Sequence, residues 1–373
     1  MICSFCVMDA TDPLIEFDLD GRCNHCKLAE DGLSEQKVGT HDWYPNSVGR
    51  QLLQQLITQV KKNSLTKPYD GILGISGGVD SCYLALKLKD LGLRILLVHV
   101  DTGWNSAAAA QNISSVVKCT GFDFRSIVVD WDEMKKLQIA FLFSGLKNLD
   151  IPQDHLIFRY LFDTAKSVGV NTFFSGGNLA TESILPKSWT GGNAFDGDLV
   201  KDVYRKYWNK NLSLPVFKFL EFYIYLPRWF KIKILRPLNY MDYNKKEAVK
   251  FLEENIDWTD YGKKHGESNF TRIYQNYILP ERYGIIKLKA HLSSEIVSGA
   301  ITRDEALKEL RRNKVDVHLR KKEIEYFLLK LDLTMLDYNK IISMEKNDVY
   351  MFKNWTRSVT LIKKLLKIFG MNH

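Results

Sequence analysis

The stretch Ser76-Gly77-Gly78-Val79-Asp80-Ser81 decides the fold of this 373-residue chain. It follows an apolar run over 71–75 and opens a segment whose apolar residues recur at helical spacing, at Leu84, Ala85, Leu88 and Leu91. A strand, a glycine turn and a helix N-terminus in succession present free backbone N–H groups and the positive end of the helix dipole to an anion. Because glycines carry no side chain, a phosphate can touch their backbone. The stretch therefore predicts a phosphate site between a strand and a helix.

Outward from this turn, apolar runs and amphipathic segments alternate along the chain. The expected strands cover 71–75, 94–100, 125–129, 170–174 and 234–238, and the expected helices 48–63, 81–91, 107–119 and 154–167. Such alternation predicts an α/β protein with a Rossmann-like, doubly wound parallel sheet. Ligands of these sheets bind at the carboxyl ends of the strands. Three polar loops follow such ends and predict one shared site: 76–81, 101–105 and 175–182.

Two cysteine pairs precede this domain, Cys3-x-x-Cys6 and Cys23-x-x-Cys26. Four thiolates at this spacing can close a tetrahedron around Zn²⁺. The residues between the pairs, 14–21, favour a short hairpin of the zinc-ribbon type. An iron–sulfur cluster and four unrelated cysteines are the alternatives. Since a closed four-thiolate site leaves no open coordination position, we expect a structural Zn²⁺.

Composition and charge bound the function less tightly. Hydrophobic residues make up 45% of the chain and charged residues 26%, which supports a sizeable core. The net charge of +8 permits a nucleotide, a sugar nucleotide or RNA as ligand without choosing among them. The N-terminus lacks the pattern of a signal peptide, and no apolar run is long enough to span a bilayer. We therefore expect a cytoplasmic protein, in which the cysteines bind metal rather than form disulfides.

Changes in pattern along the chain predict three parts. A zinc-ribbon-like module with the four paired cysteines covers 1–40, a nucleotide domain 41–245, and a helical substrate or partner region 246–373. Aromatic and basic residues are concentrated over 203–236, which favours core packing with a solvated edge and leaves membrane-surface contact as an alternative. The basic amphipathic segment 361–369 favours a packed C-terminal helix.

The glycine turn lacks the Gly-Lys-Ser/Thr sequence of a Walker loop. It resembles instead the PP-loop of the ATP pyrophosphatases, which cleave ATP between its α and β phosphates. The resemblance implies that Asp80 binds Mg²⁺, that Asp80 and Ser81 are catalytic, and that the loop holds ATP and the departing pyrophosphate through Ser76, Gly77, Gly78, Val79, Asp80 and Ser81. Such enzymes adenylate an oxygen that is otherwise a poor leaving group, and the loop donors stabilise the charge that gathers on pyrophosphate.

A closer resemblance covers nearly the whole chain. The opening Cys-x-x-Cys-Val-Met-Asp, the block Lys-His-Gly-Glu-Ser-Asn-Phe-Thr-Arg at 264–272 and the block at 298–307 are similar to the N-acetyl sugar amidotransferases. The resemblance implies that ATP adenylates the acetamido oxygen of a nucleotide-activated N-acetyl sugar and that ammonia displaces AMP. The product is an acetamidino sugar for surface polysaccharides such as the lipopolysaccharide O-antigen. Ammonia is implied to come from separate glutaminase and cyclase-like subunits resembling those of histidine biosynthesis.

One segment departs from that family. Where the family reads Phe-Gly-x-Asp-Lys-Arg, this chain has Tyr283-Gly284-Ile285-Ile286-Lys287-Leu288, so one acidic and one basic residue are replaced by apolar ones. If these positions meet the sugar or a partner, substrate or partner choice differs here. Lys287 keeps its charge.

Other candidate residues follow the remaining strands. Asp101 is expected either to face adenosine or to cap a turn, and Glu182 either to bind a second Mg²⁺ or to lie on a helix surface. Gly177 and Asn178 are expected to contact ATP. The candidates for binding the acceptor are His265, Glu267, Thr271, Arg272 and Lys287. For the first four, a capping cluster at the start of a helix is the alternative. Arg272 and Glu182 are also catalytic candidates.

The main alternative function is a tRNA sulfur-transferase, because several of these enzymes also pair a PP-loop with cysteine knuckles. They need a catalytic cysteine near ATP, and the two spare cysteines, Cys82 and Cys119, lie in no nucleophile-like setting. Only 203–236 resembles an RNA platform, so a nucleic-acid partner is not favoured. A regulatory module that binds nucleotide without chemistry is the second alternative, and the complete loop with its Asp argues against it.

Overall fold

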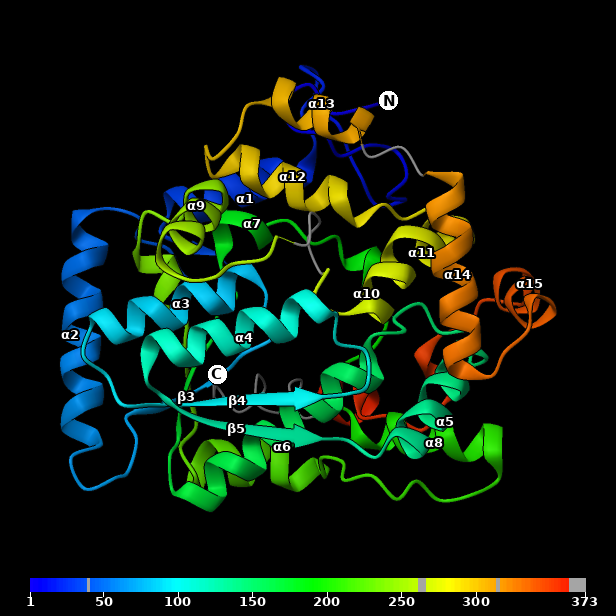
Figure 1. Ribbon diagram of the computed structural model, residues 1–373. Helices are drawn as coiled ribbons and strands as arrows, with labels where there is room; N and C mark the ends of the chain where they lie inside the picture. The colour runs from blue at the N-terminus through cyan, green and yellow to red at the C-terminus, as the bar shows by residue number, and fades with distance from the viewer. Residues whose placement is uncertain (39–40, 261–265, 313–315, 362–373) are drawn as a thin grey trace.

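The computed structural model describes residues 1–38, 41–260, 266–312 and 316–361 (Figure 1). Its centre is a five-stranded sheet in the order β5-β4-β3-β6-β7, and every neighbouring pair is parallel. The strands are β3 (Gly71–Gly74), β4 (Ile95–Asp101), β5 (Asp123–Val128), β6 (Thr172–Phe174) and β7 (Lys233–Leu235). The chain runs outward from β3 to β5, then returns to place β6 on the other side of β3. This reversal confirms the predicted doubly wound sheet, and it occurs between the two strands that carry the 76–81 and 175–182 loops.

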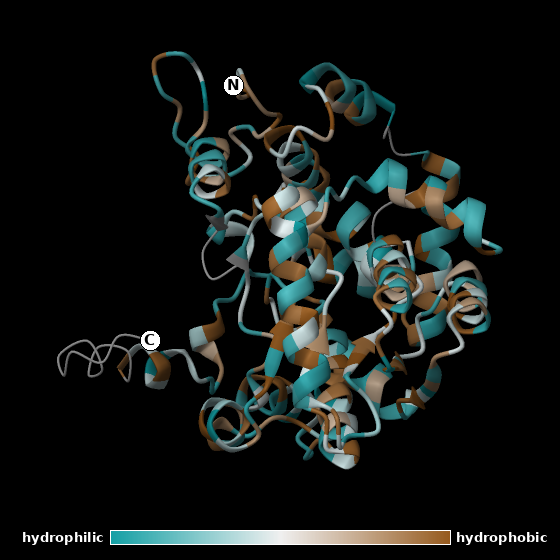
Figure 2. Cartoon of the chain, turned by 90° about the vertical axis from the view of Figure 1, so that its left-hand side faces the viewer, coloured by the Kyte–Doolittle hydropathy of each residue, from teal (hydrophilic) through white to brown (hydrophobic). Residues whose placement is uncertain are grey.

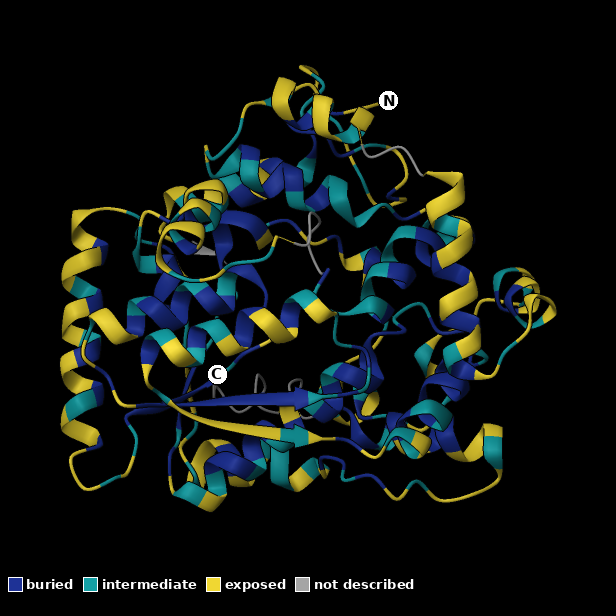
Figure 3. Cartoon of the chain, in the orientation of Figure 1, coloured by how far each residue is buried: buried dark blue, intermediate teal, exposed yellow. Residues whose placement is uncertain are grey.

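Helices cover both faces of the sheet (Figure 1). One face packs against α2 (Ser47–Asn63), α3 (Val79–Asp90), α4 (Ala107–Thr120) and α9 (Lys245–Asn255). The other packs against α5 (Trp131–Leu142), α6 (Ile151–Val168) and α8 (Gly197–Trp208). β4 is a continuous apolar run because a central strand covered by helices is buried on both faces. Figure 3 shows β4 buried and the edge strand β5 largely exposed.

The N-terminal module is built on the predicted reversal between its cysteine pairs. Phe17 and Cys23 form an antiparallel bridge, and Gly21 closes the turn at a φ of +75°, where glycine is favoured. Helix α1 (Asn24–Ser34) follows directly. Strand β1 (Lys37–Val38) comes next and pairs antiparallel with β2 (His41–Asp42). Asn46 then caps α2, whose outward side is hydrophilic (Figure 2).

The C-terminal third is helical, as predicted, and it continues the same core. Its elements are α10 (Asn269–Ile273), the π-helix η4 (Tyr274–Ile278), α11 (Leu279–Tyr283), α12 (Lys287–Val297), α13 (Arg303–Arg312), α14 (Val317–Leu331), α15 (Met335–Ser343) and the 3-10 turn η5 (Val349–Met351). Helix α12 packs against the cysteine module, where the Val7 N–H donates to Ser293 Oγ at 3.2 Å. The proposed domain boundaries stay a prediction, because one apolar cluster joins the module, the sheet and these helices.

Shorter elements connect the two layers. They are α7 (Leu179–Glu182), the 3-10 turns η1 (Lys187–Trp189) and η3 (Pro237–Tyr240), and the π-helix η2 (Glu221–Trp229). None of the helices in the described ranges is both long and apolar enough to cross a membrane. The expected C-terminal helix over 361–369 lies outside the described residues apart from its first position.

Candidate active site

The glycine turn joins the carboxyl end of β3 to the N-terminus of α3. Gly77 takes a φ of +80°, and a Cβ there would lie 2.4 Å from the Ala109 carbonyl oxygen, so only glycine fits. Ser76 Oγ accepts the Gly78 N–H at 3.2 Å and lies 3.3 Å from Ser81 Oγ. These bonds hold both hydroxyls at the start of α3, beside the positive end of its dipole.

A pocket of about 200 Å³ opens over this turn. Its walls come from the loops after β3 and β6, the first turn of α9 and the segment before α10. The lining residues are Ser76, Gly78, Val79, Asp80, Ser81, Gly176, Gly177, Glu182, Lys245 and Glu267. The fold thus gathers the predicted turn, the predicted Gly177, and two carboxylates from distant segments. A Cβ on Gly176 would lie 3.0 Å from the backbone of Asp80, which explains how closely the two loops approach.

Carboxylates give this pocket the chemistry of a magnesium site. Asp80, Glu182 and Glu267 present oxygen donors from three different segments, and oxygen donors are those that Mg²⁺ prefers. Asp80 also accepts a hydrogen bond from the Tyr243 hydroxyl, which fixes the orientation of its carboxylate. Tyr243 was not among the residues expected from sequence.

One basic residue, Lys245, lines the pocket, and a second, Arg236, lies beside Gly177. Lys245 is the first residue of α9, whose N-cap Asn244 accepts the backbone N–H groups of Lys246 and Glu247. Arg236 follows β7, and its guanidinium carbon lies 3.7 Å from a Cβ built on Gly177. Arg236 Nε is buried without a hydrogen-bond partner among the described residues, and burial lowers the pKa of this guanidinium while Glu182 opposes the shift.

These cations were missed by the sequence analysis because the signal lies in the fold. Arg236 sits just beyond the carboxyl end of an edge strand, a position that could have marked it as a candidate. Lys245 belongs to a helix that reaches the pocket only through packing of α9 on α3.

Asp101 and Asn178, which were predicted to contact adenosine and ATP, make different hydrogen bonds in the structure. Asp101 Oδ1 accepts the Gly103 N–H at 2.7 Å, which is the turn-capping alternative, and Asp101 does not line the pocket. Asn178 is fully buried and caps α7, with its Oδ1 accepting the Thr181 N–H at 3.1 Å. Asn178 therefore supports the loop and helps aim α7, with Glu182 at its end, at the pocket.

The acceptor candidates separate into three places. Glu267 lies on the pocket, and its carbonyl oxygen accepts the Ser106 N–H at 2.9 Å, which ties the segment to the loop after β4. Thr271 Oγ1 donates to Asp150 at 2.9 Å. Arg272 instead forms an ion pair with Glu323 of α14. His265 lies outside the described residues.

Lys287 belongs to a partly buried charged cluster that sequence reading did not identify. Its charge acts on Asp154, which lies one helical turn after Asp150 on α6. Burial, and then the charge of Asp150, raise the pKa of Asp154 to about 7, while Lys287 opposes the shift. The cluster lies at the carboxyl edge of the sheet, since the neighbouring Gln153 accepts from Thr102, which follows β4, at 3.1 Å.

His155, on the same helix, has a structural role. Its Nδ1 lies 2.7 Å from the Ala194 carbonyl oxygen, and its Nε2 accepts the Phe217 N–H at 3.2 Å. Burial lowers the pKa of this imidazole to about 4, so it stays neutral.

The segment that departs from the amidotransferase pattern borders a second, larger hollow of about 430 Å³. Tyr283 and Ile285 line it together with Lys147, Trp189 and Lys346. Lysines beside aromatic rings suit a ligand that carries both an anionic group and a ring. The hollow begins six residues after Glu182, at Ser188, so an extended chain keeps the two pockets within about 22 Å of each other.

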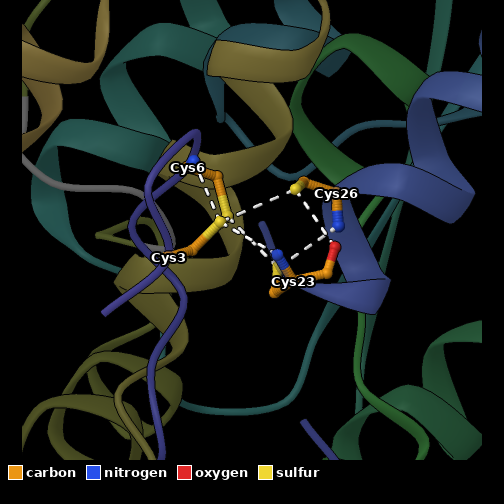
Figure 4. Close-up of side chains that lie close together, drawn as sticks. All are labelled: Cys3, Cys6, Cys23 and Cys26. Atoms are coloured by element: carbon orange, nitrogen blue, oxygen red, sulfur yellow. Dashed lines mark hydrogen bonds between the residues drawn. The ribbon is translucent and has the colours of Figure 1, made fainter. Parts of the chain in front are cut away.

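The four N-terminal cysteines are fully buried, and their sulfur atoms lie within 4.8 Å of one another (Figure 4). The Cys3–Cys26 and Cys6–Cys23 sulfur pairs are 3.7 and 3.5 Å apart. A tetrahedron with Zn–S bonds of about 2.3 Å has S···S edges of about 3.8 Å, so the spacing fits one tetrahedral ion. A multi-iron cluster places several atoms between its thiolates and needs wider spacing.

Comparisons with known proteins give a family match over part of the chain and a short match to one relative. Residues 267–366 match a family model described as LPS biosynthesis protein WbpG-like, C-terminal domain. The matched region, residues 267–366 of the 373, is similar to the C-terminal domain of that family. It contains Thr271, Arg272 and Lys287 and the departing segment 283–288. A tRNA(Ile)-lysidine synthase from Chlamydia pneumoniae is 30% identical over 90 residues, which span 21% of this chain and only 28% of that protein.

Solved structures of remote sequence show a weak similarity to this chain. NMN synthetase from Francisella tularensis is 14% identical, with a TM-score of 0.35 over 76% of this chain and 93% of that chain. The U34-tRNA thiolase NcsA from Methanococcus maripaludis, solved with its 4Fe-4S cluster, is 14% identical, with a TM-score of 0.34 over 74% of this chain and 84% of that chain. The NH3-dependent NAD synthetase from Campylobacter jejuni is 15% identical, with a TM-score of 0.28 over 35% of this chain and 58% of that chain.

Proposed function

We propose that this protein is an ATP-dependent N-acetyl sugar amidotransferase that acts in the cytoplasm on surface-polysaccharide precursors. ATP transfers AMP to the acetamido oxygen of a nucleotide-activated sugar, pyrophosphate leaves, and ammonia then displaces AMP to give the acetamidino sugar. The pocket over the Ser-Gly-Gly-Val-Asp-Ser turn carries the proposal, because it combines phosphate donors, cations and carboxylates at the reversal of strand order. The match of residues 267–366 to an LPS-biosynthesis region supports the choice of acceptor.

The phosphate half of the reaction is assigned to the loop and its neighbours. The N–H groups of 76–81 and the hydroxyls of Ser76 and Ser81 bind the β and γ phosphates, and Lys245 adds positive charge where pyrophosphate forms. Asp80 and Glu182 would hold Mg²⁺, which when bound supplies further neutralisation of the phosphate oxygens. The Tyr243 hydroxyl keeps the Asp80 carboxylate in place.

The acceptor half is assigned to the C-terminal region. Glu267 on the pocket wall would orient the acetamido group toward the α phosphate, and the hollow beside Tyr283 would hold the remainder of the sugar nucleotide. Ammonia would be supplied by glutaminase and cyclase-like partner subunits. The four-cysteine module would hold a structural Zn²⁺ that fixes the chain against α12.

The test uses a sugar labelled with oxygen-18 in its acetamido group. The purified chain is incubated with ATP, Mg²⁺, ammonium chloride and a panel of UDP-acetamido sugars, and AMP and products are analysed by mass spectrometry. We expect the label to appear in AMP and the sugar to exchange its acetamido oxygen for NH. Asp80→Ala should abolish both signals while the far-UV circular dichroism stays unchanged.

The RNA alternative rests on one observation, the 90-residue match to a tRNA(Ile)-lysidine synthase. The spare cysteines argue against sulfur transfer. Cys82 is fully buried, burial raises the pKa of its thiol, and neither Cys82 nor Cys119 lines the pocket. AMP release with undermodified tRNA, but with none of the sugars, would replace the proposed acceptor by RNA.

A further inference from the structure

The π-helix η2 exposes a stripe of large apolar side chains. Leu220 is 65% exposed, Trp229 68% and Tyr225 42%, and Ile234 on the neighbouring edge strand β7 is 53% exposed. Ile224 lies between them and is also exposed. We call these five residues the apolar stripe. Large apolar side chains exposed this close together in one segment mark an interaction site more often than scattered single residues do.

The inner side of η2 holds this stripe firmly in place. Leu226 is buried, and the rings of Phe222 and Tyr223 pack against Trp355, at 6.1 and 5.8 Å between centroids. Glu221 is bound by Arg159 at 2.6 Å and by Lys166 at 2.7 Å. The outward residues are therefore presented by an anchored helix.

Basic residues lie in the same segment of sequence as the stripe. Lys218, Arg228, Lys231 and Lys233 are all exposed. The acidic residue within 218–234 is Glu221, and its charge is already paired with α6. The surface thus combines apolar side chains with a net positive charge.

We propose that this surface docks the protein on an anionic lipid membrane. Tryptophan and tyrosine favour the interface between headgroups and acyl chains, and lysine and arginine favour anionic headgroups. RNA would also attract the bases and could stack on the rings. RNA would not bury the exposed aliphatic side chains Leu220, Ile224 and Ile234, whereas a bilayer would bury them.

The position of the stripe leaves the active site accessible. Asn171 Nδ2, just before β6, donates to the carbonyl oxygens of Phe230 and Lys231 at 3.2 and 3.0 Å. The stripe therefore lies at the amino edge of the sheet, whereas the pocket lies at the carboxyl edge. A membrane-bound molecule would still exchange ATP and sugar nucleotide with the solvent.

Liposome flotation tests the proposal with the full chain. Vesicles of phosphatidylcholine alone are compared with vesicles that also contain phosphatidylglycerol, and binding is measured as the fraction of protein that floats. We expect binding only to the anionic vesicles, and weaker binding as salt is raised. Trp229→Ala should reduce the partition several-fold, and Lys218→Glu/Lys231→Glu/Lys233→Glu roughly a hundredfold.

A charge-matched control separates local from general electrostatics. Lys250→Glu/Lys308→Glu/Lys321→Glu changes three exposed lysines on α9, α13 and α14 by the same net amount, and it should retain more than half of the binding. Equal loss in both triple variants, or full binding by the Lys218 triple variant, would overturn the proposal. So would binding of single-stranded RNA that is lost in the same variants while anionic vesicles fail to bind.

Discussion

Lys245 is the residue that supplies a fixed positive charge to the phosphate pocket in the absence of a Walker lysine. Its neighbour Lys246 points elsewhere and contacts Glu305 at 3.1 Å on the surface. We expect Lys245→Met to lower kcat/KM for ATP by roughly 10- to 100-fold, because a charge-assisted contact to phosphate is lost. Lys246→Met is the matched control and should stay within about twofold. Pyrophosphate release measures both, and equal effects would contradict the role given to Lys245.

The raised pKa of Asp154 predicts that the stability of the folded protein depends on pH. The folded state keeps this carboxyl protonated up to about pH 7, whereas the unfolded chain loses the proton near the ordinary pKa of 3.8. Between these values the folded state binds more protons, so this residue makes the free energy of unfolding fall as pH rises. Asp154→Asn removes the effect and should be more stable than the wild type at pH 8, by a few kcal/mol at most, and nearly equal at about pH 4.

Urea unfolding at several pH values measures this difference. The exposed Asp90 gives a control, and Asp90→Asn should shift the curve by less than about 0.5 kcal/mol at every pH. A parallel pH dependence in Asp154→Asn and the wild type would show that Asp154 is ionised in the folded protein.

At the scale of elements, the junction of β3 and α3 depends on backbone that only glycine can adopt. Gly77→Ala would force its Cβ to within 2.4 Å of the Ala109 carbonyl oxygen and should nearly abolish pyrophosphate release. Gly121 ends α4 with a similar φ of +68°, but no atom lies within 4 Å of its Cβ position. Gly121→Ala should therefore cost about 1 kcal/mol of stability and leave activity unchanged. Comparable activity in the two variants would contradict the tight approach of α4 to the loop.

The strands and the helices that flank the loop were predictable because each carries a strong local signal. β4 is a continuous apolar run because it is buried. α2 and α4 carry apolar residues at helical spacing because one side of each helix is buried. Helices α5 and α8 were not assigned, and η2 is a π-helix interrupted by Pro227, a form without a simple sequence period.

The site was predictable only in part for the same reason. The Ser76–Ser81 turn has a local pattern. Packing of α9 brings Lys245 to the pocket and Tyr243 to Asp80, and the placement of β7 brings Arg236 beside Gly177. Arg272 shows the converse. Its sequence block suggested a substrate contact, and the fold directs its charge to Glu323.

At the scale of the whole molecule, the four-cysteine module is part of the core rather than an appendage. Arg303 donates to the carbonyl oxygens of Cys3 and Cys6 at 2.9 and 3.1 Å, and Lys289 pairs with Asp9. Cys23→Ser should therefore lose the metal and lower the midpoint of thermal unfolding by several degrees. Cys119→Ser, at a half-buried thiol outside the module, is the control and should keep both. Metal content is read by mass spectrometry, and a metal-replete, equally stable Cys23→Ser protein would contradict a structural ion.

The contact between Val7 and Ser293 joins residues 286 positions apart, and the contact between Cys3 and Arg303 joins residues 300 apart. The cysteines leave the ribosome long before their packing partners on α12 and α13 exist. We therefore expect the module to bind its metal before it packs against α12 and α13 during synthesis. It would then stay metal-bound but unpacked for most of translation. Closure of this long loop would then be the late step of folding, and the one most sensitive to metal supply in the growing cell.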